Sequence, residues 1–140
     1  MPERHNPEEP PIEANPSPGT IAWVDLTVAD AEGVRDFDRD VVGWSATDVD
    51  MGGYPDFCMH PAPDAPPVAG VCHARGINAG LPPAWLVYLR VADLDASLAA
   101  CVGRGGTVLL GPRGMGDAGR YAVIRDPAGA AVALVGPGPG

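Results

Sequence analysis

Val28-Ala29-Asp30 returns later in the chain as Val91-Ala92-Asp93, and both copies stand at the same place in a longer pattern. Residues 21–28 read Ile-Ala-Trp-Val-Asp-Leu-Thr-Val and alternate with the two-residue period of a strand that has one face on a core. Residues 85–91 form a second strand-like run that ends in the second copy. The repeat therefore indicates one supersecondary unit written twice.

The segments after the two copies have the pattern of short helices. Asp30 and Asp93 are suitable N-caps, because an aspartate side chain accepts a hydrogen bond from a free amide of the first turn. Glycines end both helical patterns, at Gly43 and from Gly103 onward. The apolar side chains that recur at helical spacing, and that we expect to face the core, are Val34, Phe37 and Val41 in the first copy and Leu94, Leu98 and Cys101 in the second.

Three short strand candidates follow each helix, separated by turns rich in Gly and Pro. They are residues 44–49, 54–60 and 68–73 in the first copy and residues 107–110, 121–124 and 131–135 in the second. Residues 111–119 are expected to form a long Gly-rich loop. The sequence thus predicts an α+β fold made of two β-α-β-β-β units.

We expect a single domain over residues 19–135, with unit 1 at about residues 20–76 and unit 2 at about residues 83–135. A chain of this length can bury enough apolar surface to fold without disulfides or structural metal.

The two ends of the chain are expected to lie outside this domain. Residues 1–18 are rich in Pro, Glu and Asn and are expected to be a disordered tail, because they can bury too little apolar surface to offset the entropy of ordering. Residues 136–140 are expected to be a flexible C-terminus.

Charge and composition exclude several classes of partner. The formal net charge is -9 and no basic stripe is present, which argues against nucleic acid. No apolar run approaches the roughly 20 residues of a membrane helix. The 3 cysteines lack CxxC spacing and no secretory h-region opens the chain, so we expect a reduced, cytoplasmic protein.

Several motifs give the chain a family resemblance: Trp44 directly after Gly43, Gly105-Gly106-Thr107-Val108, and the ending Arg125-Asp126-Pro127-Ala128-Gly129. Together with the paired units, they resemble the vicinal oxygen chelate superfamily, the glyoxalase, bleomycin-resistance and dioxygenase fold. The resemblance implies an open, cup-shaped mixed β-barrel in which each unit forms one half. It also implies a homodimer, which the shortness of both helices favours.

Enzymes of that superfamily usually hold a divalent metal in the cup, through His or Glu residues of the first and last strands of each unit. The family's pattern places Trp23 and Leu86 at the two first-strand positions, and Ala133 and Ala69 at the two last-strand positions. None of these side chains is a metal donor. We therefore expect neither a metal site nor a cofactor.

Strand alternation indicates what remains in the cup. If Trp23 faces inward, so do Asp25 and Thr27, and Tyr88 and Arg90 follow Leu86 on the second copy. His73 is expected to share this inner face, and Asp56 to flank the mouth together with residues 113–120. The predicted ligand-binding residues are Trp23, Asp25, Asp56, His73, Tyr88 and Arg90, with His73 and Asp25 as a candidate acid and base.

Structural roles compete with these assignments. Trp23 and Tyr88 could serve packing, and Arg90 could pair with Asp93 or Asp95. A buried carboxylate at Asp25 needs a partner, for which His73 and Arg90 are the candidates. Cys72 and His73 are adjacent on a predicted strand, so their side chains should point to opposite faces and should not form a nucleophile and base pair.

Two functions follow from these residues. The first is a metal-free protein that binds a small aromatic or apolar organic molecule, for resistance or sequestration. The second is a metal-independent lyase, isomerase or cyclase of small-molecule metabolism. A metal-dependent glyoxalase or dioxygenase would need ligands that the four expected positions lack.

Overall fold

The structure is a computed structural model that describes residues 17–138. Its elements, in chain order, are β1 (Ile21–Val28), α2 (Ala31–Val42), β2 (Ser45–Asp50), β3 (Pro55–His60), β4 (Ala69–His73), η1 (Gly76–Asn78), β5 (Leu86–Arg90), α3 (Leu94–Gly103), β6 (Thr107–Gly114), η2 (Gly116–Ala118), β7 (Arg120–Arg125) and β8 (Ala131–Gly136). The expected tail, residues 1–18, lies outside the described residues except for Ser17 and Pro18, which form a turn before β1.

The strands form one eight-stranded mixed sheet in the order β2-β3-β4-β1-β5-β8-β7-β6. Within each unit the first strand pairs in parallel with the last, β1 with β4 and β5 with β8, and β1 and β5 join the units in an antiparallel pair. The edge strands β2 and β6 do not close the sheet. The predicted α+β fold of two β-α-β-β-β units around an open cup is confirmed.

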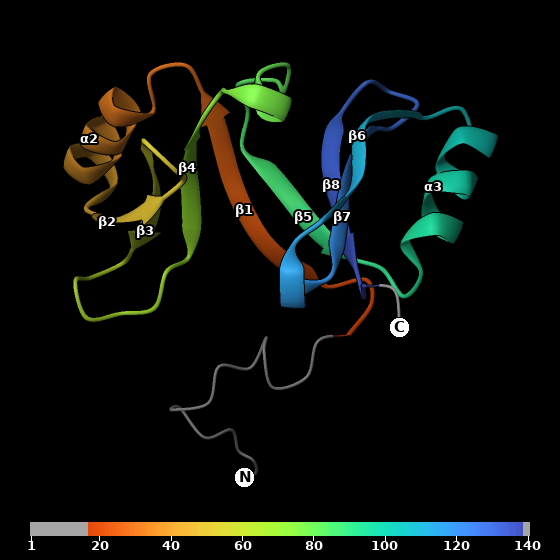
Figure 1. Ribbon diagram of the computed structural model, residues 1–140, viewed down its shortest axis with the longest axis horizontal. Helices are drawn as coiled ribbons and strands as arrows, with labels where there is room; N and C mark the ends of the chain where they lie inside the picture. Colours follow the sequence, from red (N-terminus) through yellow and green to blue (C-terminus); the bar gives the residue numbers. More distant parts are fainter. Residues whose placement is uncertain (1–16, 139–140) are drawn as a thin grey trace, which may run out of the picture.

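The two helices lie at opposite ends of the molecule, each outside its own half of the sheet (Figure 1). Both begin at the predicted caps, since Asp30 accepts a hydrogen bond from the Gly33 amide at 3.0 Å and Asp93 accepts one from the Ala96 amide at 3.1 Å. Neither described helix is long and apolar enough to cross a membrane.

The face that α2 presents to the sheet differs from the prediction. Ala31 and Asp38 are buried, whereas Phe37 and Val41 are 61% and 64% exposed. Ala31, Val34 and Asp38 follow one another at spacings of three and four residues, so they share one face of the helix. The prediction was wrong for Phe37 and Val41, because the face of the helix that packs on the sheet runs through Asp38.

The Gly-rich segment after β6 is also more regular than predicted. β6 continues to Gly114, and irregular pairing between Leu110 and Arg113 lets the strand pass Gly111, which has a φ of +97°. An extra residue at such an irregularity bends a strand without ending it. The expected loop over residues 111–119 is therefore reduced to a short turn around η2.

Three buried clusters hold the fold together. One lies under α2 around Phe57 and Met59, and another lies under α3 around Leu94 and Leu134. The third covers the inner face of unit 2, where Leu81, from the segment between the units, packs against Leu86, Val123 and Ala133. Apolar side chains around Leu86 therefore fill part of the inner face of unit 2.

Candidate small-molecule site

The register of β1 with its two neighbours defines the inner face of the cup. Trp23 lies opposite Tyr88 of β5, and Asp25 lies opposite Leu86 of β5 and Gly70 of β4. Residues opposite one another in a sheet point to the same face. The prediction that Trp23, Asp25, Leu86 and Tyr88 share a face is confirmed.

The same register corrects one of the four positions compared with the family's metal ligands. Asp25 pairs with Gly70 as Tyr88 pairs with Ala133, at the offset that separates Val28 from Val91. The counterpart of Ala133 is therefore Gly70, and not Ala69, which is 1% exposed and packs in the cluster under α2. Alignment by a turn was off by one residue, and a slip of one residue exchanges the two faces of a strand.

The corrected inner positions do not fit a divalent metal ion. Trp23, Gly70, Leu86 and Ala133 offer an indole, a hydrogen atom, an isobutyl group and a methyl group, and none of these is a metal donor. Within residues 17–138, no group of three or more His, Cys, Asp or Glu residues is placed to hold a metal.

A cavity of about 340 Å³ opens where the inner face is not filled by the apolar cluster. Four of the six predicted ligand-binding residues line it: Trp23, Asp25, Tyr88 and Arg90. Its remaining lining residues are Ala22, Met115 and Val135. The volume lies in the range of small-molecule sites, and an aromatic wall with a few polar groups is the usual composition of such sites.

His73 and Asp56 do not line this cavity. The prediction that His73 shares the inner face with Asp25 is wrong, because His73 lies opposite Val28, whereas its neighbour Cys72 lies opposite the inward-facing Thr27. The His73 ring instead contacts Asp56, with Nδ1 3.2 Å from Oδ1, and lies edge-on to Tyr54. Cys72 and His73 point to opposite faces, as predicted.

Asp25 is the group with the most unusual electrostatics in the cavity. Burial raises the pKa of its carboxyl from 3.8 to about 6, while hydrogen bonding from Tyr88 lowers it, the charge of Asp56 raises it, and hydrogen bonding from Trp23 lowers it. The partners expected from the sequence, His73 and Arg90, are not those found. Asp25 can therefore exchange a proton near neutral pH inside a mostly apolar cavity.

Arg90 does not pair with Asp93 or Asp95, which was the structural alternative to a role in ligand binding. Its Nη1 donates to Thr20 Oγ1 and to the Ile21 carbonyl, both at 3.0 Å. Asp95 is paired with Arg120 at 3.0 Å, and Asp93 caps α3. Both acidic candidates are therefore occupied elsewhere.

Sequence reasoning missed Tyr121 and Cys72 on the inner face. The Tyr121 ring lies 6.2 Å from that of Tyr88. Met115, from the segment expected to flank the mouth, lines the cavity from the turn after β6. Cys72 also faces inward, but burial raises the pKa of its thiol, so the reactive thiolate is disfavoured. Tyr121 could have been found from alternation, because it lies two residues before the inward-facing Val123.

The chain belongs to the Glyoxalase/Bleomycin resistance protein/Dioxygenase superfamily, which it matches over residues 20–134. It is 35% identical over 117 residues to the putative glyoxylase CFP32 of Mycobacterium tuberculosis, an alignment that covers 83% of this chain and 45% of that protein. It is 34% identical over 133 residues to the anthracycline biosynthesis protein DnrV of Streptomyces peucetius, with 84% of this chain and 47% of that protein covered.

The chain spans about half the length of these curated relatives. Among solved structures, methylmalonyl-CoA epimerase from Mycobacterium tuberculosis superposes with a TM-score of 0.52 at 21% identity, over 89% of this chain and 93% of the epimerase. At this identity the similarity shows a shared fold.

Proposed function

We propose that this protein binds a small aromatic or apolar organic molecule in a metal-free cup, as a resistance or sequestration protein. The observation that supports this best is the convergence of Trp23, Asp25, Tyr88 and Arg90 on one cavity of about 340 Å³. Aromatic faces supply contact area for a planar ligand, and the few polar groups fix its orientation. The lack of donors at the four inner positions supports the metal-free part of the proposal.

Binding is tested by native mass spectrometry and calorimetry against a panel of aromatic metabolites with one to four rings. We expect Trp23→Ala to reduce the affinity for the best ligand by about tenfold or more, because the indole forms part of the cavity wall. Trp85→Ala is the matched control, since Trp85 lies edge-on to Trp44 and does not line this cavity. Equal losses in the two variants would contradict the proposed cavity.

Metal content is tested on the same sample. We expect elemental analysis of the purified protein to find less than one-tenth equivalent of divalent ion, with ligand binding unchanged by a chelator. A stoichiometric ion whose removal abolishes binding would overturn the metal-free proposal.

A second candidate function is a metal-independent lyase, isomerase or cyclase, and the environment of Asp25 favours it specifically. A carboxyl with a pKa of about 6 can accept and return a proton at neutral pH. The relative named for anthracycline biosynthesis makes a polycyclic aromatic substrate a reasonable choice. Turnover of a bound ligand that is lost in Asp25→Asn, while binding persists, would favour the enzyme over sequestration.

We further infer a cytoplasmic homodimer. The exposed Phe37, Val41 and Val42 side chains give α2 an apolar outer surface that a second copy would cover. The 3 cysteines of the chain are free in the structure, which suits a reducing compartment.

A further inference from the structure

One row of side chains crosses unit 2 on the inner face of the cup. Arg90 of β5 lies opposite Val135 of β8, Val135 lies opposite Tyr121 of β7, and Tyr121 lies opposite Arg113 of β6. Residues in such a row point to the same face. The row therefore has a guanidinium at each end and a tyrosine and a valine between them.

Arg90 lines the cavity, and Arg113 lies one strand beyond Tyr121, whose ring is 6.2 Å from that of the cavity residue Tyr88. Burial raises the pKa of Tyr121 and the positive charge of Arg113 lowers it, so Arg113 lies near this tyrosine. Neighbouring strands are about 4.8 Å apart, so the backbones of the two arginines are separated by about 14 Å. Two long side chains can approach one group bound over Tyr121 from both sides.

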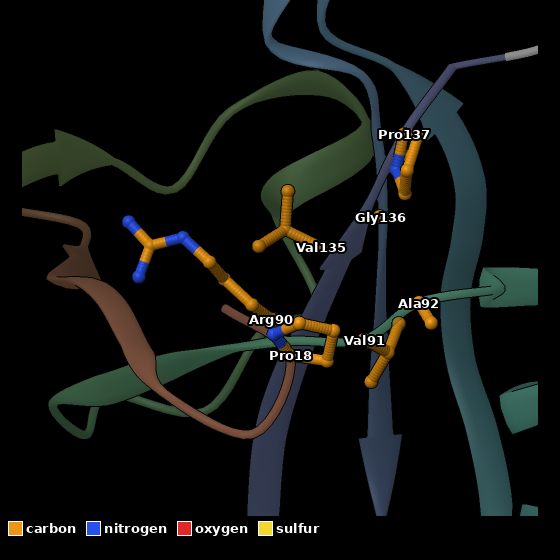
Figure 2. Close-up of a pocket in the computed structure, with 7 residues that line it drawn as sticks. All are labelled: Pro18, Arg90, Val91, Ala92, Val135, Gly136 and Pro137. Atoms are coloured by element: carbon orange, nitrogen blue, oxygen red, sulfur yellow. The ribbon is translucent and has the colours of Figure 1, made fainter. Parts of the chain in front are cut away.

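These guanidinium groups retain free donors. Arg90 uses Nη1 for Thr20 and Ile21, and neither Arg90 nor Arg113 has an acidic partner among residues 17–138. A second hollow of about 210 Å³ reaches Arg90 and Val135 from the rim (Figure 2). In Figure 2 the Arg90 side chain extends away from Val91 and Ala92, which line this hollow.

Asp25 makes the two ends of the cavity chemically different. Asp25 lies opposite Leu86, four residues before Arg90 on β5, which places the two rows about 13 Å apart. Trp23 and Tyr88 form the row between them. The cavity thus has a cationic end at Arg90, an aromatic middle, and a carboxyl at its far end.

We propose that the ligand is an aromatic carboxylic acid, whose carboxylate is bound by Arg90 and Arg113 while its ring system lies against Trp23 and Tyr88. This inference rests on the proposed function and names the chemical class of the ligand. A guanidinium fork matches the two oxygens of a carboxylate, and charge-assisted hydrogen bonds are stronger than neutral ones. The separation from Asp25 keeps the two carboxyl groups at opposite ends.

The test compares matched acids and amides, because an amide keeps the shape of the acid and removes its charge. Benzoate and benzamide, 2-naphthoate and 2-naphthamide, and anthracene-2-carboxylate and its amide are titrated calorimetrically at pH 7.5. We expect the acid of the best-fitting ring size to bind at least about tenfold more tightly than its amide. We expect Arg113→Gln and Arg90→Gln each to reduce the ratio of the acid's affinity to the amide's affinity by about threefold or more.

Arg104→Gln is the matched control, because it removes one positive charge at the end of α3 and should leave the ratio unchanged. Since Arg90 also contacts Thr20 and Ile21, Arg90→Lys keeps the charge without the fork and should give an intermediate ratio. Amides that bind as tightly as the acids would overturn this inference and leave the proposed function standing. No binding by any probe of either kind would count against both.

Discussion

Nδ1 of His73 lies 3.2 Å from Oδ1 of Asp56, and the same oxygen accepts the His73 backbone amide at 2.9 Å. The backbone pairing of β3 with β4 runs from Met59 and Ala69 to Phe57 and Val71. The Asp56 carboxylate therefore continues the connection between the two strands beyond their ladder. It also fixes an imidazole that sequence reasoning had placed beside Asp25.

His73→Ala should consequently change stability more than ligand affinity. The variant loses the ring contacts with Asp56, Tyr54 and Phe57 but keeps the backbone hydrogen bond. We expect the free energy of unfolding in urea to fall by about 1–3 kcal/mol. A tenfold loss of ligand affinity or turnover without loss of stability would restore His73 to the functional site.

The sequence was sufficient to predict the structure at positions where the residue pattern fits only one environment. The strand over residues 21–28 and both aspartate caps were predicted correctly, because a long alternation and a capping side chain are each specific. The residues of β4 that face the cup were not predicted correctly, since Ala69 and Gly70 are both small enough for either side of a sheet. A register error of one residue then moved His73 to the wrong face.

Gly70 is predicted to be necessary for the shape of the cavity wall. A Cβ at this position would lie 3.1 Å from the Asp25 Cβ, so Gly70→Ala must displace the lining residue Asp25, and it would lie in ordinary contact with the Trp23 Nε1 at 3.5 Å. We expect the variant to bind the best ligand several-fold more weakly in calorimetry. Gly80→Ala is the control, because a Cβ there meets nothing within 4 Å. Wild-type affinity in Gly70→Ala would show that the ligand does not depend on this wall.

Asp38→Ala is predicted to stabilise the protein. Asp38 is 7% exposed, its Oδ2 has no hydrogen-bond partner in the described structure, and burial raises the pKa of its carboxyl. Alanine removes this uncompensated group and has a higher helix propensity. We expect the free energy of unfolding in urea at pH 7 to rise by about 1–2 kcal/mol. Asp40→Ala, on the exposed side of the same helix, is the control and should change this free energy by less than about 0.5 kcal/mol. A destabilised Asp38→Ala would mean that the carboxylate has a partner in solution.

The exposed apolar face of α2 leads to a prediction about the oligomeric state. Phe37→Ser combined with Val41→Ser should convert the proposed homodimer to a monomer, because the change removes the exposed apolar surface that a second copy would cover. Light scattering after size exclusion measures the mass directly. Val102→Ser, an equally exposed apolar position on α3, should leave the dimer intact. A wild-type protein that is monomeric at all concentrations would remove the basis of this prediction.

The pKa of Asp25 gives the folded state a defined pH dependence. Burial raises this pKa from 3.8 to about 6, so between these values the folded protein binds a proton that the unfolded chain has released. The stability associated with the protonated carboxyl is complete below about pH 4 and is lost as the pH rises through about 6, with a total of about 3 kcal/mol. Asp25→Asn keeps the shape of the side chain and cannot ionise. We therefore expect the stability of this variant relative to wild type to rise by about this amount between pH 4 and pH 8 in urea unfolding. A difference that stays constant over this range would mean that Asp25 titrates in the folded protein as it does in the unfolded chain.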